Sequence, residues 1–294
     1  MTYLVGEALD YILNVWLKNL LAEVTIGNAK TGITIYNDIV GKTISMLTTN
    51  PMRWNEQGWK LISQEIYPAF LVVACPLVAI FWLAAFCAES IDPKMHGDVR
   101  PETLLISFFK LAVAEFVTTY SLYFVCFLFG FVDALTDGWV GNNARIPTKL
   151  GFTIAEINQL PLLSVVLVFL FSLVYFGVLV FVAGVILYTA TVRFFKILAL
   201  IPFGTLASST IAGTREVSRS ALSFWKYILS VILEAVAIML MLALFSRIQS
   251  SIMLVNLSGD LEIIGMLLNR IMFAFLCLGS VKGAETLLQK GLGI

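Results

Sequence analysis

The sequence contains 294 residues, of which 59% are hydrophobic and only 13% are charged, and its mean hydropathy is +0.92. Its nineteen basic and nineteen acidic residues cancel, so the composition excludes an ordinary soluble domain and a strongly basic nucleic-acid binder. Most of the chain falls in apolar runs near the ~20 residues that cross hydrocarbon. An all-α polytopic membrane protein is therefore predicted.

Residues 1–65 are predicted to form an amphipathic helical region outside the hydrocarbon, extracytoplasmic or interfacial, before a transmembrane domain at 66–294. From residue 4 to 24, apolar residues recur at helical spacing between charged ones, which is typical of a helix lying in an interface or packing on partner helices. Further along, Gly27, Gly32, Gly41, Asn50-Pro51 and several charges are expected to break the chain into short pieces, with helices near 34–47 and 56–64.

Five later stretches are predicted to span the membrane, at 66–88, 103–135, 160–191, 227–246 and 261–278. The third is 32 residues long, roughly 48 Å as a helix, so it must tilt or project beyond a ~30 Å core. The short run 197–214 contains Pro202 and Gly204. It is predicted not to cross but to form a broken or re-entrant element packed against protein.

Lys and Arg in short loops predict the orientation of the spans. With five spans, a basic cluster collects on one side, consisting of Arg193, Lys196, Arg215, Arg219 and Lys226. That side is predicted to be cytoplasmic, which puts the amino terminus outside the cell membrane and the carboxyl terminus in the cytoplasm. The cluster would set topology and contact anionic lipid, or else bind a partner ATPase or a nucleic-acid backbone.

Four polar residues inside predicted spans are candidate functional residues: Glu115, Glu234, Asn269 and Arg270. A charge in hydrocarbon costs ~2.5 kcal/mol or more unless it is paired or faces water. The glutamates therefore predict either interhelical bonding or an ion or proton pathway, with Arg270 as a partner for either. Asn269 and Arg270 could instead snorkel to an interface.

Small residues predict sites of close helix contact. Gly204, Ser208 and Ala212 are spaced by four, which places them on one helical face. Together with Gly177 and Gly184 of the long third helix, they are candidates for helix packing within one subunit or for an oligomer seam.

Nothing in the sequence predicts an enzyme. It contains no phosphate-binding loop, nucleophile elbow or zinc-protease motif, and its cysteines lie in apolar segments without metal-ligand spacing. His96 is the only histidine, and we interpret it as a solvated loop residue. We therefore expect no catalytic, cofactor-binding or metal-binding residues.

Several segments resemble the TrbL-type polytopic membrane subunits of type IV secretion systems, in particular the small versions from Gram-positive conjugative elements. They are FFKLAVAEFVTT at 108–119, VRFFK at 192–196, ALIPFGTLA at 199–207 and VKGAETLLQKGLG at 281–293, together with the Met95-His96 pair. The chain departs from the family at Tyr120-Ser121-Leu122-Tyr123, where a polar Asn or Asp would be expected.

The resemblance implies a channel scaffold subunit for conjugative DNA transfer and protein translocation. It also implies a homo-oligomeric ring, other secretion-system membrane subunits and a translocation ATPase as partners, surrounding phospholipid, and single-stranded DNA with relaxase in transit. The layout alone implies a scaffold, transporter or channel. The alternative is a secondary transporter or ion channel using Glu115 and Glu234, although the sequence shows no internal repeat.

Overall fold

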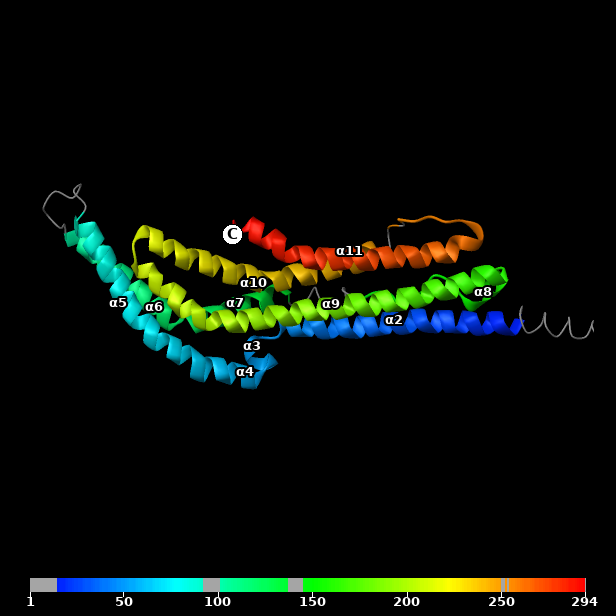
Figure 1. Ribbon diagram of the computed structural model, residues 1–294, viewed down its shortest axis with the longest axis horizontal. Helices are drawn as coiled ribbons and strands as arrows, with labels where there is room; N and C mark the ends of the chain where they lie inside the picture. Colours follow the sequence, from blue (N-terminus) through cyan, green and yellow to red (C-terminus); the bar gives the residue numbers. More distant parts are fainter. Residues whose placement is uncertain (1–14, 92–100, 137–144, 250–251, 253, 294) are drawn as a thin grey trace, which may run out of the picture. The chain divides into compact units, whose positions relative to one another are not determined.

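A computed structural model describes residues 15–91, 101–136, 145–249, 252 and 254–293 (Figure 1). These residues form helices and connecting coil, with no strand among them. The helices are α2 (Leu17–Thr48), α3 (Pro51–Trp54), α4 (Glu56–Lys60), α5 (Tyr67–Ile91), α6 (Pro101–Thr119), α7 (Ser121–Thr136), α8 (Ile154–Gln159), α9 (Leu162–Ser209), α10 (Arg215–Ile248) and α11 (Glu262–Gly291). A π-helical segment, Leu61–Ile66, joins α4 to α5.

The described residues divide into two compact units. Unit 1 takes its residues from 1–45, 138–190 and 237–283, and unit 2 takes its residues from 46–137, 191–236 and 284–294. The helices α9, α10 and α11 each contribute residues to both units.

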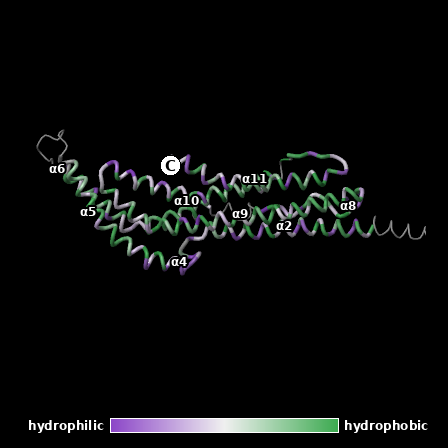
Figure 2. Tube along the Cα trace, viewed as in Figure 1, coloured by the Kyte–Doolittle hydropathy of each residue, from purple (hydrophilic) through white to green (hydrophobic). Residues whose placement is uncertain are grey.

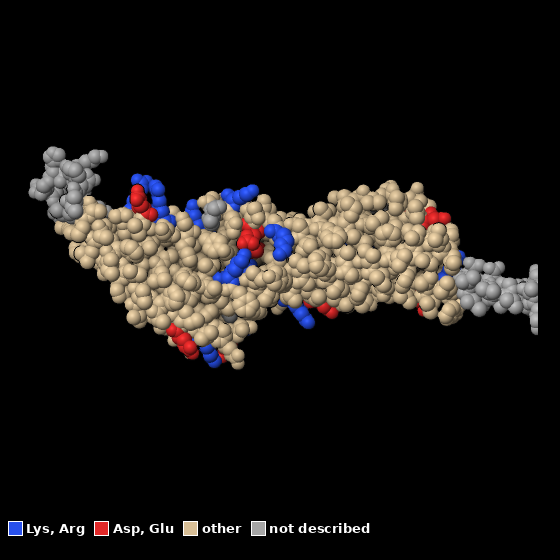
Figure 3. Space-filling model, in the orientation of Figure 1, with Lys and Arg blue, Asp and Glu red and all other residues tan. Residues whose placement is uncertain are grey.

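The predicted membrane fold is confirmed. Among the described residues, four helical runs are long and apolar enough to cross a membrane: Glu56–Ala88, Leu162–Ala212, Arg215–Ile248 and Gly259–Gly291. A bent pair, Leu104–Thr119 with Ser121–Thr136, makes a fifth if it crosses as one span. Hydrophobic residues predominate along these helices (Figure 2), and few charged side chains lie on the face drawn in Figure 3.

The predicted breaks in the amino-terminal region are wrong at the three glycines and confirmed at Asn50-Pro51, where α2 has ended and α3 begins. Helix α2 continues for 32 residues through Gly27, Gly32 and Gly41. A glycine costs a helix about 1 kcal/mol, and packing offsets this cost. At Gly32 a Cβ atom would lie 3.3 Å from the Phe176 side chain, so the glycine permits close approach of α2 to α9. Residues 1–14 of the predicted amphipathic helix lie outside the described residues.

The prediction of a broken element at Pro202 and Gly204 is also wrong. Helix α9 runs for 48 residues through both positions, and only a short 3-10 turn, Thr210–Ala212, separates it from α10. Proline removes one backbone donor, a loss that a helix surrounded by protein can accommodate. Pro202 is buried, and its carbonyl accepts a hydrogen bond from Thr205 Oγ1 at 2.8 Å.

The break in the fold lies instead between α6 and α7, where one continuous span was expected. The two helices meet at Tyr120 with a bend of 67°. The buried Tyr67 hydroxyl from α5 fills this bend: it donates to the Thr119 carbonyl at 2.9 Å and accepts from the Leu122 amide at 3.3 Å. It also lies 3.1 Å from Ser121 Oγ. A side chain inserted into the backbone ladder explains the kink.

We predict that Tyr67→Phe destabilises the protein by about 1–3 kcal/mol, because it removes a hydroxyl that satisfies two freed backbone groups. The midpoint of thermal unfolding in detergent measures this effect. Tyr188→Phe is the matched control, because it removes the same hydroxyl from an exposed position. Equal midpoints for the two variants would contradict a structural role for the Tyr67 hydroxyl.

Candidate functional site

The most deeply buried charge in the described residues is Arg193 of α9, in unit 2, whose side chain is only 1% exposed. Its Nε atom donates to the Val231 carbonyl at 2.7 Å, and its Nη2 atom donates to the Ile232 carbonyl at 2.9 Å. Both carbonyls belong to α10. The guanidinium therefore ties α9 to α10 through backbone acceptors.

Acidic residues of unit 2 balance its buried basic groups. Glu234 of α10 is 3% exposed and lies close enough to Arg193 for electrostatic attraction between them. One turn along α9, Lys196 forms a 2.8 Å ion pair with Glu285 of α11. Glu234 also attracts Lys196. The result is an internal charge network in which Glu234 sits beside two cations, as the pairing interpretation of this glutamate predicted.

This network corrects the predicted basic cluster. Arg193 cannot contact lipid headgroups or nucleic acid, because it is enclosed between helices, and Lys196 is committed to Glu285. Arg215, Arg219 and Lys226 of α10 are exposed and remain available to such partners. The sequence grouped all five because they are neighbours in the chain, whereas helical phase decides which of them face inward.

The other predicted intramembrane carboxylate, Glu115 of α6, is half-buried and lies against Cys75 of α5. Near it in sequence, Lys110 donates to the Gly213 carbonyl, which follows the turn after α9. These contacts lie within unit 2 and hold α6 to its neighbours.

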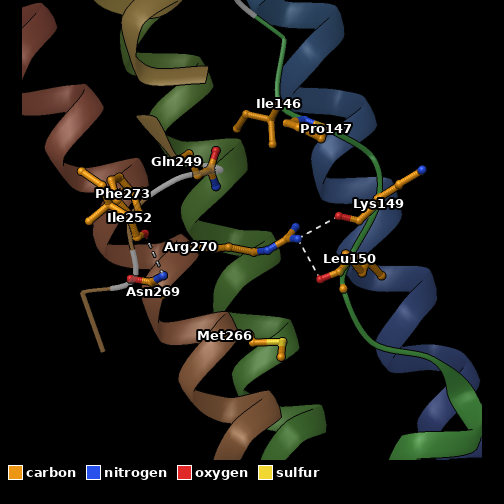
Figure 4. A pocket seen from close by; sticks show the side chains of 11 residues that line it. Ile146, Pro147, Lys149, Leu150, Gln249, Ile252, Met266, Asn269, Arg270 and Phe273 are labelled. Atoms are coloured by element: carbon orange, nitrogen blue, oxygen red, sulfur yellow. Dashed lines mark hydrogen bonds between the residues drawn. The ribbon is translucent and has the colours of Figure 1, made fainter. Parts of the chain in front are cut away.

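In unit 1, the predicted polar pair Asn269 and Arg270 of α11 binds backbone of other segments. Asn269 Oδ1 accepts from the Leu254 amide at 2.8 Å. Arg270 Nη2 donates to the carbonyls of Lys149 and Leu150, each at 2.8 Å (Figure 4). Arg270 therefore binds these carbonyls in place of the predicted glutamate partner, whereas its snorkelling to an interface stays a prediction.

The carbonyls that Arg270 binds belong to an extended coil, residues 145–153, in unit 1. On its other side, Asn37 of α2 accepts from the Ile146 amide and donates to the Ile146 carbonyl, both at 2.9 Å. Backbone groups that are enclosed by protein require such internal partners. The Ile146 and Leu150 side chains are buried, so the coil is an integral part of the unit 1 packing.

A cavity of about 520 Å³ lies beside this coil (Figure 4). Its wall combines apolar side chains such as Met266 and Phe273 with the polar groups of Gln249, Asn269 and Arg270. The Lys149 ammonium points away from Arg270 in this view. The volume is within the range of small-molecule sites. No group of His, Cys, Asp and Glu suited to a metal occurs among the described residues, and His96 lies outside them.

The predicted small-residue positions have two different roles. Gly204, Ser208 and Ala212 are buried within unit 2, where Ser208 Oγ accepts from Trp225 Nε1 at 3.1 Å and Ala212 packs with Val78 and Ala114. They are helix-packing residues of one subunit, so the assignment of Ser208 to an oligomer seam is wrong.

Gly177 and Gly184 of α9 are exposed, and a Cβ atom built at either would meet nothing within 4 Å. They are seven residues apart, on one helical face. Their role as an oligomer seam stays a prediction.

Sequence reasoning missed Tyr67, Asn37 and Trp225. Each is an ordinary residue type in a helix, and its partner lies far away in the chain: Asn37 binds Ile146, and Tyr67 binds Thr119. A polar residue on an otherwise apolar helix face was the only available signal for Asn37.

No protein-family model, curated protein or solved structure matches this chain. The candidate functional site is therefore defined by the contacts described above.

We predict that Arg193→Met destabilises the protein by about 3–5 kcal/mol, because it removes two hydrogen bonds and the cation beside buried Glu234. Arg219→Met, at an exposed position, should be close to neutral. The double variant Arg193→Met/Glu234→Gln should recover part of the loss, because no charge is then left alone. Thermal unfolding in detergent measures all three, and a double variant less stable than Arg193→Met would contradict the coupling.

Proposed function

We propose that this chain is a membrane-embedded scaffold subunit of a type IV secretion machine for conjugative DNA transfer. The observation that supports it best is the use of charged side chains between helices: buried Arg193 and half-buried Lys196 tie α9 to α10 and α11, as expected of a rigid frame. The described residues contain no metal-binding cluster. The assignment to conjugation rests on the sequence resemblance to TrbL-type subunits, which brings an energy-supplying ATPase, other membrane subunits, DNA and relaxase as partners.

The outer surfaces of unit 2 suit this proposal. Large apolar side chains of α6 and α7 point outward, with Phe109, Phe127 and Leu105 each about 70% exposed. Such a surface requires lipid or partner helices. In the proposed orientation the amino terminus is outside the cell membrane and the carboxyl terminus is cytoplasmic, so that exposed Arg215, Arg219 and Lys226 face anionic lipid or the ATPase.

The secondary transporter or ion channel is less favoured. A proton carrier in a transport pathway must be reached by water, whereas Glu234 is only 3% exposed and lies beside Arg193. We therefore assign Glu234 to helix pairing in the scaffold.

We predict that the ring uses the exposed glycine face of α9. Gly177→Leu or Gly184→Leu should lower the oligomeric mass of the detergent-solubilised protein, because a bulky side chain prevents close approach of another helix. Val180→Leu, a substitution at an already bulky position of the same helix, should leave the mass unchanged. Wild-type mass for both glycine variants would exclude this face as the seam.

The proposed function predicts that an in-frame deletion of the gene in a donor cell abolishes conjugative DNA transfer and that the wild-type gene restores it. Transfer that continues without the gene would contradict the proposal. The alternative is tested with the purified protein reconstituted into liposomes. A solute or proton flux that Glu234→Gln abolishes would favour the transporter instead.

A further inference from the structure

The outer face of α2 is polar along most of the helix. From Glu23 to Ser45, every exposed position of α2 except Val24 carries a polar side chain or is a glycine. After Glu23 these positions are Gly27, Lys30, Thr31, Thr34, Asp38, Lys42 and Ser45. Hydrophilic residues recur along α2 in Figure 2. We call this surface, from Glu23 to Ser45, the polar face of α2.

The inner face of α2 fixes its depth relative to α9. Within unit 1, Lys18 Nζ donates to the Leu160 carbonyl at 2.8 Å, and Gly32 lies against Phe176 and Leu179. The contact later in α2, at Gly32, is made further along α9, whereas the contact at Lys18 is made at Leu160, just before α9 begins. The two helices therefore run parallel, as they do in Figure 1. The polar face of α2 therefore lies at the level of residues 165–190 of α9.

That segment of α9 belongs in hydrocarbon. No charged residue occurs from 160 to 192, and its outward side chains are large and apolar, including Leu173, Phe181 and Tyr188, all more than half exposed. Unit 1 thus presents an apolar face that requires lipid or another apolar helix and, at the same depth, a polar face with four charged side chains. Charges exposed to lipid at this depth are strongly unfavourable.

We propose that the polar face of α2 lines a water-filled lumen, enclosed when copies of this chain close into a ring. The inference rests on the proposed ring-forming scaffold function and assigns the surface along which cargo passes. Water on this face removes the conflict between the two faces, because the charged side chains then stay hydrated while the apolar side chains of α9 contact lipid or a neighbouring copy.

The charge pattern indicates what such a lumen would admit. In a ring, each charged residue repeats at one level, so Glu23, Lys30, Asp38 and Lys42 give stacked rings of alternating sign. Seven residues of helix separate the first two rings by roughly 10 Å. Ion-selective pores use rings of one sign. Alternating rings suit a wide, hydrated passage for a large cargo that carries both charges, such as a protein with attached nucleic acid.

Site-directed spin labelling of the full chain in liposomes tests the lumen. The four cysteines, Cys75, Cys87, Cys126 and Cys277, are first replaced, and the wild-type unfolding midpoint verifies the background. Labels are then placed at Lys30, Thr34 or Asp38 of α2. The matched controls are exposed Phe275 or Leu276 of α11, which lie at the same depth because the adjacent Cys277 Sγ is 3.8 Å from the Tyr36 hydroxyl of α2. Thr34→Cys is nearly isosteric, so this position remains testable if a charge replacement prevents folding.

We expect a water-soluble nickel complex to relax the labels on α2 at least five times more strongly than those on α11, and dissolved oxygen to show the opposite preference. Nickel access to both helices would mean that unit 1 lies in water, and this result would overturn the lumen. Nickel access to neither helix would mean that protein or lipid covers the polar face, and it would overturn the lumen equally.

These readouts are independent of DNA transfer. A lipid-facing or covered α2 in a protein whose deletion abolishes transfer would reject the lumen and retain the scaffold function. A water-facing α2 in a protein whose deletion leaves transfer intact would reject the secretion function and leave the lumen assignment standing.

Discussion

Hydrocarbon offers no water to a freed backbone carbonyl or a charged side chain, and the described contacts follow from the need to satisfy these groups within the protein. Where the chain bends between α6 and α7, the Tyr67 hydroxyl binds the carbonyl and the amide that the bend releases. Where unit 1 contains extended coil, Asn37 and Arg270 bind its backbone from two helices. Each irregular segment is thus matched by a polar side chain from another helix.

The same constraint governs the charges of α9 and α10. Arg193 uses helix carbonyls and a nearby glutamate, and Lys196 uses Glu285, so a long apolar helix can carry two cations near its middle. Removing Arg193 leaves the Glu234 charge buried without compensation, which makes this contact more costly to break than a surface ion pair. Charges used in this way hold helices together, and they are then unavailable for transport chemistry.

Helix α2 carries charged groups that the same constraint applies to but that the other described helices do not satisfy. Its charged residues Glu23, Lys30, Asp38 and Lys42 are exposed in the described part of unit 1, yet its buried face places them at the depth of the most apolar part of α9. One surface of unit 1 therefore requires lipid or another apolar helix, and another requires water. Assembly around an aqueous space satisfies both requirements with one arrangement of helices, and this links the amphipathic character of α2 to the proposed role of the chain in passing cargo.

The sequence by itself determined the membrane class and the approximate spans, because apolar run length depends only on local composition and the thickness of hydrocarbon. It also identified Glu234, Asn269 and Arg270 as special, since polar groups in apolar runs are costly wherever they point. Tertiary structure decided their partners, the continuity of α9 through Pro202, and the bend at Tyr120. Those outcomes depend on contacts such as Tyr67 with Thr119 and Arg193 with Val231, between residues far apart in the chain, which no local pattern specifies.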